Sequence, residues 1–300
     1  MKLRALLELI RIPAVFTAPA DVLMGAGVMA VLTGRPQLDA PTLLSAVVAS
    51  ALVYCAGMAT NDLFDLKADL LARPERPLPS RRLSLSEAWI FVALAQTIAV
   101  CTAWAIGWPS FVAVVATISL TYLYNSSLKA LFIGPLLMGL CRVANGLIGA
   151  SIVADPFRPD SAYLLVPVLS LTFAHVVFLT WIARFETHKR IPAVVKWFVV
   201  MQVLVCCLPP LLVIVFKAQL SLTWSTALGV IGALWMARSL GRLRGELDEM
   251  RVRGLVLRGI KGVAFLNASI LFVFGHYLLG GIVLALLVPG RYVAKTFYAT

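Results

Sequence analysis

The sequence predicts an all-α, polytopic membrane protein in which about nine transmembrane helices form one bundle. Of the 300 residues, 61% are apolar and 13% are charged, and the mean hydropathy is +0.92. A soluble globular domain carries about 25% charged residues, and a helix needs about 20 mostly apolar residues to span a bilayer. The chain has room for nine such runs and little else, so we expect residues 1–300 to form a single transmembrane domain.

Nine apolar runs define the predicted helices, and the fourth and eighth are short. They fall near 13–32, 41–60, 88–107, 110–124, 132–153, 162–181, 191–216, 222–237 and 263–288. The breaks between them coincide with Pro, Gly or charge clusters, as at Trp108-Pro109 and Gly134-Pro135.

Lys and Arg residues alternate in number between successive loops. The N-terminal segment and the loops after the even-numbered helices carry 19 of the 26 Lys and Arg residues, and the other loops and the C-terminus carry 5. Cytoplasmic loops of membrane proteins are enriched in Lys and Arg. The alternation predicts a cytoplasmic N-terminus in a bacterial-type inner or plasma membrane. It also explains the net charge of +12 without a nucleic-acid partner.

The strongest chemical signal follows the second run, in the segment Asn61–Asp69, NDLFDLKAD. Asn61, Asp65 and Asp69 are spaced four residues apart, so they share one face if the helix continues. Carboxylates at one membrane boundary repel each other, and the C-terminal end of a helix disfavours anions. A positive partner is therefore expected. Mg²⁺ suits the site because it prefers oxygen ligands and commonly binds carboxylates together with substrate phosphates.

Basic residues follow the acidic segment at once. Arg73 and Arg76 lie in the stretch Arg73–Ser80, and Arg81 and Arg82 come next. Acids for a metal beside bases for phosphate are typical of a diphosphate site. One alternative is a solvated acidic loop, which fits less well because the cluster abuts the apolar core and basic residues follow at once. A second alternative is that topology alone places the arginines, which fits Arg81 and Arg82 well and Arg73 and Arg76 less well.

These residues resemble the UbiA-type intramembrane prenyltransferases. That family carries the motif N-D-x-x-D-x-x-x-D at the end of helix 2, followed by a basic R-P-L-P segment. Asn61–Asp69 matches every fixed position, and Arg76-Pro77-Leu78-Pro79 matches the segment that follows. The resemblance implies that the protein ionises an isoprenyl diphosphate with Mg²⁺ and passes the allyl cation to an acceptor, often an aromatic ring. It covers most of the chain, although the last three helices match only in their apolar layout.

A second match follows the fourth run. The segment Tyr124–Lys129, followed by Gly134-Pro135, is similar to the family's Y-S-x-x-L-K segment. The resemblance implies that Lys129 contacts phosphate and that Tyr124 walls the site or donates a hydrogen bond. A snorkelling lysine beside an interfacial tyrosine would give the same pattern, and the first motif is what decides against that interpretation.

Polar residues inside the predicted helices mark a third candidate site. Arg142 and Asn145 lie three apart on one face of the fifth run, and Asp21 lies in the first run. A charge inside a membrane helix is costly and usually faces a cavity or a partner. We therefore predict that Arg142 and Asn145 contact substrate, with an Arg142–Asp21 ion pair as the structural alternative.

The chain departs from the family pattern after the sixth run. The family has a second aspartate motif there, which holds a second metal, whereas this chain has Ala183–Arg190, ARFETHKR. Glu186 is the only carboxylate in that segment, so it is the predicted remaining metal ligand. We expect Arg184 or Lys189 to contact the diphosphate directly in place of one metal's charge. The pattern looks like a divergent branch, similar to the EboC-type proteins.

The first function that the sequence suggests is Mg²⁺-dependent transfer of a prenyl group from an isoprenyl diphosphate to a lipophilic acceptor. The metal ligands would be Asp62, Asp65 and Asp69, with Asn61 orienting the metal. Lys129 and Arg76 would stabilise the leaving diphosphate, since such catalysis is mostly stabilisation of developing charge. The bundle would enclose a central apolar cavity that holds the isoprenoid tail and keeps water from the cation.

The second function is that of a transporter or a lipid-binding or isoprenoid-binding protein on the same scaffold. Asp21 and Arg142 would then line a pathway. Such a protein has no obvious need for three carboxylates at these spacings beside arginines, so the sequence favours the enzyme. In either case we expect the surface to contact membrane lipids, including anionic lipids at its basic loops.

The charge pattern generates a topology prediction. The loops bearing Asp65, Lys129 and Glu186 should all face the cytoplasm. Cysteine-accessibility labelling at single sites in these loops should give the same sidedness for all three, and one loop labelled from the opposite face would contradict the helix assignment.

Overall fold

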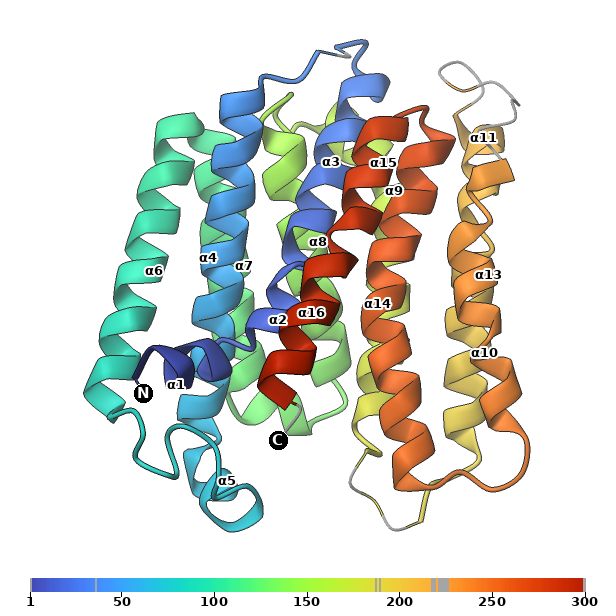
Figure 1. Cartoon of the computed structure of the whole chain (residues 1–300). Coiled ribbons are helices and arrows are strands. Elements are labelled where there is room, and N and C mark those ends of the chain that lie inside the picture. The colour runs from blue at the N-terminus through green and yellow to red at the C-terminus, as the bar shows by residue number, and fades with distance from the viewer. Residues whose placement is uncertain are drawn as a thin grey trace.

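Helices form all the regular structure that the computed structural model describes, in residues 2–35, 37–186, 188, 190–216, 220 and 227–298, with the backbone alone for 293–298. Figure 1 shows the long helices side by side in one bundle. Two short helices, α1 (Lys2–Leu9) and α2 (Ile12–Val15), precede the bundle. In Figure 1, α1 lies across the lower part of the first helices.

The first five long helices are α3 (Ala18–Leu32), α4 (Ala40–Phe64), α6 (Leu85–Ile106), α7 (Trp108–Asn125) and α8 (Gly134–Ser151). The rest of the bundle contains α9 (Pro159–Ala183), α10 (Val194–Cys206), α11 (Leu212–Val215), α13 (Ile231–Ala237) and α14 (Glu249–Val273). The connecting elements are α5 (Leu66–Ala72), η1 (Ser127–Ala130), η2 (Pro209–Leu211) and η3 (Leu240–Leu243). The first seven predicted runs each coincide with one of these helices or with consecutive helices. Part of the eighth, 222–226, lies outside the described residues.

The protein is a multi-pass membrane protein by the length and composition of its helices. Six described stretches are long and apolar enough to cross a bilayer: Ile12–Leu32, Ala40–Phe64, Leu85–Ile106, Pro159–Ala183, Val194–Val215 and Glu249–Val273. The expected number of about nine spans is therefore not confirmed. α7 and α8, of 18 residues each, pack in the bundle without belonging to this set.

The ninth predicted run, 263–288, is wrong as a single helix. α14 already begins at Glu249, where the Asp248 carboxylate caps it by accepting a hydrogen bond of 2.7 Å from the Arg251 N–H. It ends at Val273, and Gly275 then reverses the chain with a φ of +79°. Glycine adopts this left-handed conformation without the strain of a side chain. Apolar residues continue on both sides of this turn, so the hydropathy pattern does not reveal it.

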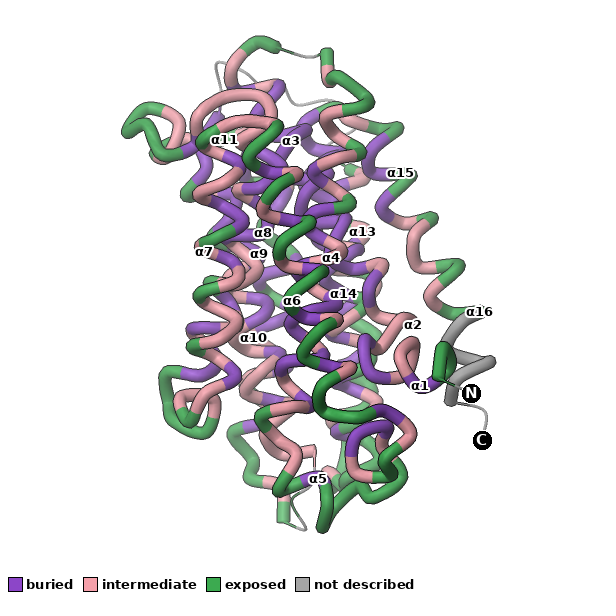
Figure 2. The backbone as a smooth tube through the Cα atoms, turned by 90° about the vertical axis from the view of Figure 1, so that its left-hand side faces the viewer, coloured by how far each residue is buried: buried purple, intermediate pink, exposed green. Residues whose placement is uncertain are grey.

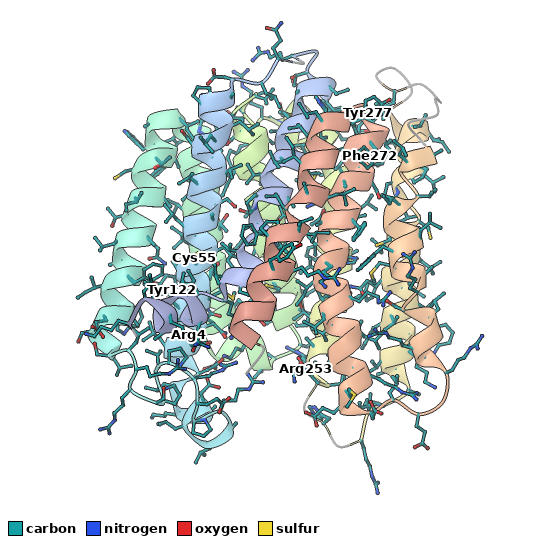
Figure 3. The ribbon with its side chains drawn as sticks, viewed as in Figure 1. Arg4, Cys55, Tyr122, Arg253, Phe272 and Tyr277 are labelled. Atoms are coloured by element: carbon teal, nitrogen blue, oxygen red, sulfur yellow. The ribbon has the colours of Figure 1, made fainter. Side chains whose placement is uncertain are left out.

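After the reversal, α15 (Tyr277–Ala285) and α16 (Leu287–Tyr298) return along the bundle. Figure 3 places Phe272 and Tyr277 at one end and Arg4 and Arg253 at the other, and Figure 1 shows the C-terminus coming back toward the N-terminal end. α16 lies against α2 there. Nine spans would place the C-terminus on the side opposite to the N-terminus, whereas α16 packs beside the N-terminal α2.

The central helix of the bundle is α3, in which 14 of 15 residues are buried, so no side of it is left for lipid. Figure 2 shows this buried interior surrounded by helices that are exposed on their outer faces. Gly25 and Gly149 bring α3 and α8 into backbone contact. A methyl group on Gly25 would overlap the Gly146 carbonyl, and one on Gly149 would overlap the Val22 carbonyl. Small residues permit such close approach of membrane helices.

A buried polar network joins α3 to other helices of the bundle. Asp21, with 0% of its surface exposed, accepts hydrogen bonds from Arg142 at 2.8 Å and Asn145 at 2.9 Å, both on α8. It also accepts one of 2.8 Å from Asn267 on α14. Further hydrogen bonds to the network involve Thr17 just before α3, Ser50 on α4 and Thr172 on α9. The ion pair that the sequence left as an alternative is thus present, and it is embedded in hydrogen bonds.

Replacing Arg142 by Met should destabilise the protein by about 3–5 kcal/mol, because removing one partner of a buried pair leaves an uncompensated charge. The double variant Asp21→Asn with Arg142→Met should recover most of this loss, since the amide that replaces the carboxylate carries no charge. The measurement is thermal unfolding in detergent, with Arg158→Met, at an exposed position, as the matched control. Unchanged stability in Arg142→Met would mean that the network does not hold the bundle together.

Candidate active site

The acidic segment forms where α4 passes into α5. Asp65 ends α4 with φ −85° and ψ 0°, and α5 starts at the next residue. Hydrogen bonds of 2.9 Å run from the Asp65 N–H to the Asn61 carbonyl and from the Asp69 N–H to the Asp65 carbonyl. The helical repeat therefore continues through the junction. This agrees with the expectation that Asn61, Asp65 and Asp69 follow one face.

Two of the carboxylates are buried and share one arginine. Asp62 is 5% exposed and Asp69 is 6% exposed. The Nη1 atom of Arg76 lies 2.6 Å from Asp69 Oδ2 and 3.3 Å from Asp62 Oδ1. Arg11 Nη2, from the segment before α2, reaches the same Asp62 oxygen at 2.9 Å. Burying these carboxylates would be costly without such partners.

The third carboxylate, Asp65, pairs with Lys129 from η1. Both side chains are about a quarter exposed, so this pair lies at the surface of the cluster. The η1 turn is fixed from within by Ser126, whose hydroxyl accepts a hydrogen bond from the Leu128 N–H. It is also held from outside by Arg184 at the end of α9, which donates to the Lys129 carbonyl at 2.6 Å and to the Leu131 carbonyl.

Asn61 belongs to the same cluster through neutral hydrogen bonds. Its amide donates to the Asn125 side-chain oxygen at 3.0 Å, and Asn125 donates to the Gly57 carbonyl at 3.2 Å. Arg11 Nη2 lies 3.5 Å from the Asn61 oxygen, at the limit of a hydrogen bond. Tyr124, beside Asn125, lies within electrostatic range of Asp65, Arg184 and Arg11. The two motifs that are separate in the sequence therefore meet at one site.

Sequence reasoning missed two members of this cluster. The sequence motifs assign Arg11 no role in the site, yet it contacts both Asn61 and Asp62. The feature of the sequence that could have indicated Arg11 is its position as a basic residue directly before Ile12-Pro13. In the structure, Arg11 adopts a left-handed conformation with φ +50°. Asn125 stands in the second motif, but only its neighbour Tyr124 and Lys129 were read as functional.

Other predicted site residues lie elsewhere. Arg73 is exposed at the end of α5 and takes part in none of the ion pairs among the described residues. Glu186 pairs with Arg253 at the start of α14, at 3.9 Å, rather than with a group of the first motif. Arg142 and Asn145 are engaged by the Asp21 network. Lys189 lies outside the described residues. The predicted roles of these residues in binding metal or substrate stay predictions.

The guanidinium of Arg184 already has several partners within the protein. Besides its two carbonyl partners, its guanidinium lies over the Trp181 ring, 4.6 Å from the ring centroid. A planar guanidinium is well suited to such combined stacking and forked hydrogen bonding. In this arrangement Arg184 fixes the position of the Lys129 turn.

The donor set of the cluster fits Mg²⁺. Three carboxylates and an amide oxygen are hard oxygen donors. One cationic nitrogen, Arg76 Nη1, already bridges Asp62 and Asp69, where a small cation would also be attracted. In the described part of the chain, no group of three Asp, Glu, His or Cys side chains converges as a preformed metal site. The carboxylates of Asp62, Asp65 and Asp69 each pair with an Arg or Lys instead. Binding a metal would therefore require these cations to release their carboxylates.

An open, shallow pocket elsewhere on the structure does not adjoin this cluster. It has a volume of about 310 Å³ and lies between α6 and α7, where its lining includes Gln96, Val100 and Ser119. The predicted central apolar cavity for the isoprenoid tail stays a prediction.

Solved structures share the fold of this chain. A UbiA homolog from Aeropyrum pernix K1 aligns with a TM-score of 0.65 at 18% identity, covering 86% of this chain and 96% of that one. A UbiA homolog from Archaeoglobus fulgidus, solved bound to DMAPP and Mg²⁺, aligns with a TM-score of 0.57 at 17% identity, covering 88% of this chain and 98% of that one. At these identities the likeness shows the fold alone.

Sequence comparison identifies the family. The digeranylgeranylglyceryl phosphate synthase of Sulfolobus acidocaldarius is 29% identical over 178 residues, which is 58% of this chain and 62% of that protein. The matched region thus spans about three fifths of that relative's length. The sequence profile of the UbiA prenyltransferase family matches residues 22–257, which include both motifs of the acidic cluster. The chain therefore belongs to the UbiA prenyltransferase family.

Proposed function

We propose that this protein transfers a prenyl group from an isoprenyl diphosphate to a lipophilic acceptor within the membrane, with Mg²⁺ as cofactor. One observation carries the proposal: the carboxylates of Asp62, Asp65 and Asp69 are each matched by a cation at the end of α4. Three acids and three bases meet there, from segments far apart in the sequence. A magnesium-bound diphosphate, whose charges largely cancel, could enter this site by exchanging partners with both sets.

The carboxylates would hold the metal, and the cations would bind the diphosphate. Asp62 and Asp69 are the buried ligands and Asp65 the accessible one. Arg76 and Lys129, once released from them, offer donors to the diphosphate oxygens, to which charge-assisted hydrogen bonds are strong. When bound, Mg²⁺ supplies further positive charge for the oxygen that leaves.

The chain's own contribution is then electrostatic and positional. The C–O bond of the diphosphate breaks with its electron pair on oxygen, and Lys129 and Arg76 stabilise that charge as it develops. The allylic carbon bonds to the acceptor, which gives up a proton. Apolar helix faces around the site would keep water from the carbocation.

The comparisons support this proposal at the level of substrate class. Relatives bear the name of a prenyl-transferring synthase, and archaeal structures of this fold were solved with DMAPP or GPP and Mg²⁺. The acceptor is left open, because the name of a relative fixes the acceptor only for that relative.

The transporter alternative loses its motivating observation. Asp21 and Arg142 pair with each other and with Thr17, Asn145 and Asn267, so their charges have partners within the bundle. A pathway lined by them is therefore not needed to explain their presence.

Replacing Asp65 or Asp69 by Ala should remove the Mg²⁺ dependence of prenyl diphosphate binding. We expect the affinity for geranyl diphosphate in saturating Mg²⁺ to fall at least about 100-fold, since first-contact ligands matter at least as much as their supporting residues. Isothermal titration with Mg²⁺ or with EDTA measures this. Each Ala variant removes negative charge near Lys129 or Arg76, which favours binding of the diphosphate without metal. The decisive quantity is therefore the ratio of the affinity in Mg²⁺ to the affinity in EDTA.

The matched control for both variants is Glu75→Ala, an exposed acid in the loop that follows the motif. It should keep the wild-type ratio. If both aspartate variants also keep that ratio, the acidic cluster is only a charge-balanced structural element and the proposed metal site is wrong.

A second experiment separates Arg184 from Glu186. Arg184→Ala should weaken diphosphate binding about tenfold in saturating Mg²⁺, because it removes the donors that fix the Lys129 turn. It should cause no further loss in a Lys129→Ala background, as a double-mutant cycle shows when one residue acts through another. Glu186→Ala should reduce activity less than Asp65→Ala.

The opposite pattern would assign the roles differently. Unchanged affinity in Arg184→Ala together with complete loss in Glu186→Ala would show that Glu186 anchors a second metal. Additive losses in the Arg184 and Lys129 variants would show that Arg184 contacts the diphosphate itself.

A further inference from the structure

Three arginines come from the end of α13, from η3 and from α14, and none of them has an acidic partner among the described residues. They are Arg238, Arg242 and Arg258. The ion pairs that the structure shows along α14 belong to Arg251 and Arg253 instead. Two donor atoms of Arg258, Nε and Nη1, are buried without any hydrogen-bond partner. Burying guanidinium donors without an acceptor is costly, so these two atoms favour an anionic ligand.

The positive charges of Arg238 and Arg242 lie within electrostatic range of Arg258. Arg242 lies against the backbone of α14, where a methyl group on Gly254 would overlap its Nη1. Gly254 and Arg258 are one helical turn apart and so lie on the same face.

Trp235 of α13 fixes Arg258 beside the other two arginines. Its ring lies 5.4 Å from the Arg258 guanidinium carbon, and its Nε1 donates to the Arg258 carbonyl at 3.3 Å. The same ring stacks on Phe265, which lies about two helical turns after Arg258 on α14. The cluster is thus held by aromatic packing rather than by acids.

Acidic residues nearby in the sequence do not neutralise the cluster. Asp248 caps α14 and pairs with Arg251. Glu246 and Glu249 form no ion pair among the described residues, and Glu249 is exposed. Like charges repel one another, so a counter-anion would stabilise the arrangement.

The surroundings identify the class of anion. Leu234, one turn before Arg238, is 61% exposed, and Leu257, next to Arg258 on α14, is 54% exposed, so exposed aliphatic side chains neighbour two of the arginines along their helices. The cluster lies at the end of the bundle where α13 leads into α14, which is also the end that holds Arg253 (Figures 1 and 3). A ligand with both a phosphate and acyl chains matches positive charge beside exposed aliphatic surface.

We propose that Arg238, Arg242 and Arg258 form a specific site for the phosphate headgroup of an anionic phospholipid, with Leu234 and Leu257 contacting its acyl chains. The site is distinct from the acidic cluster and does not depend on prenyl transfer. Its occupant supplies the acceptor oxygens that the buried Nε and Nη1 of Arg258 lack.

Native mass spectrometry of the full-length protein in detergent tests the proposal, by titration with phosphatidylglycerol, phosphatidylcholine or glycerol phosphate. Wild type should retain one phosphatidylglycerol in preference to phosphatidylcholine. Each basic residue near a lipid surface contributes about 1 kcal/mol. Arg242→Gln or Arg258→Gln should therefore reduce the affinity about fivefold, and the double variant about 25-fold.

Two variants control for charge and folding. Arg244→Gln removes an exposed arginine of the same loop and should bind like wild type. Arg258→Lys keeps the charge and should bind between wild type and Arg258→Gln, while thermal unfolding checks that each variant folds. Equal affinity of wild type and the double variant would overturn the proposal. Equal binding of glycerol phosphate and phosphatidylglycerol would also overturn it, by showing a site for soluble phosphates rather than for lipid.

Discussion

Charge neutralisation at the end of α4 is the constraint on which the rest of the structure depends. Asp62 and Asp69 are nearly inaccessible, and a carboxylate in such a place needs a cation within hydrogen-bonding distance. The chain meets this need with Arg76 from the following loop and with Arg11 from before the first long helix. The positions of α2 and of the loop after α5 are therefore tied to the acidic segment, and that segment in turn lies where substrate phosphates would be bound.

The interior contains a second ion pair of a different character. Asp21 and Arg142 sit between α3 and α8, whose backbones meet at Gly25 and Gly149. Every oxygen of the Asp21 carboxylate has a donor, so this network needs no ligand. The acidic cluster satisfies its charges with long, partly exposed Lys and Arg side chains, which the proposed function would exchange for a metal and a phosphate. The partners of Asp21 are less exposed, so the role of its network in the structure is to hold helices together.

The sequence predicted the acidic cluster well because its spacing is local. Four-residue steps from Asn61 to Asp69 place side chains on one helical face whatever the surrounding fold. Arg11 could not be found in this way, since its contact with Asp62 depends on how the N-terminal segment folds back over α4. The hairpin at Gly275 was missed for a similar reason: a turn between two apolar helices leaves hydropathy unchanged. The pairing of Glu186 with Arg253 likewise depends on where α14 begins, which the arginine-rich composition of its first turns concealed.

The return of the chain at Gly275 also joins the two ends of the protein. α16 rests against α2, and Gly290 approaches the Pro13 carbonyl so closely that a methyl group there would lie 2.9 Å from its oxygen. Pro13 is two residues from Arg11, which donates a hydrogen bond to Asp62. The C-terminal helix therefore packs against the segment that carries Arg11, so the two ends of the chain together fix where this cation meets Asp62.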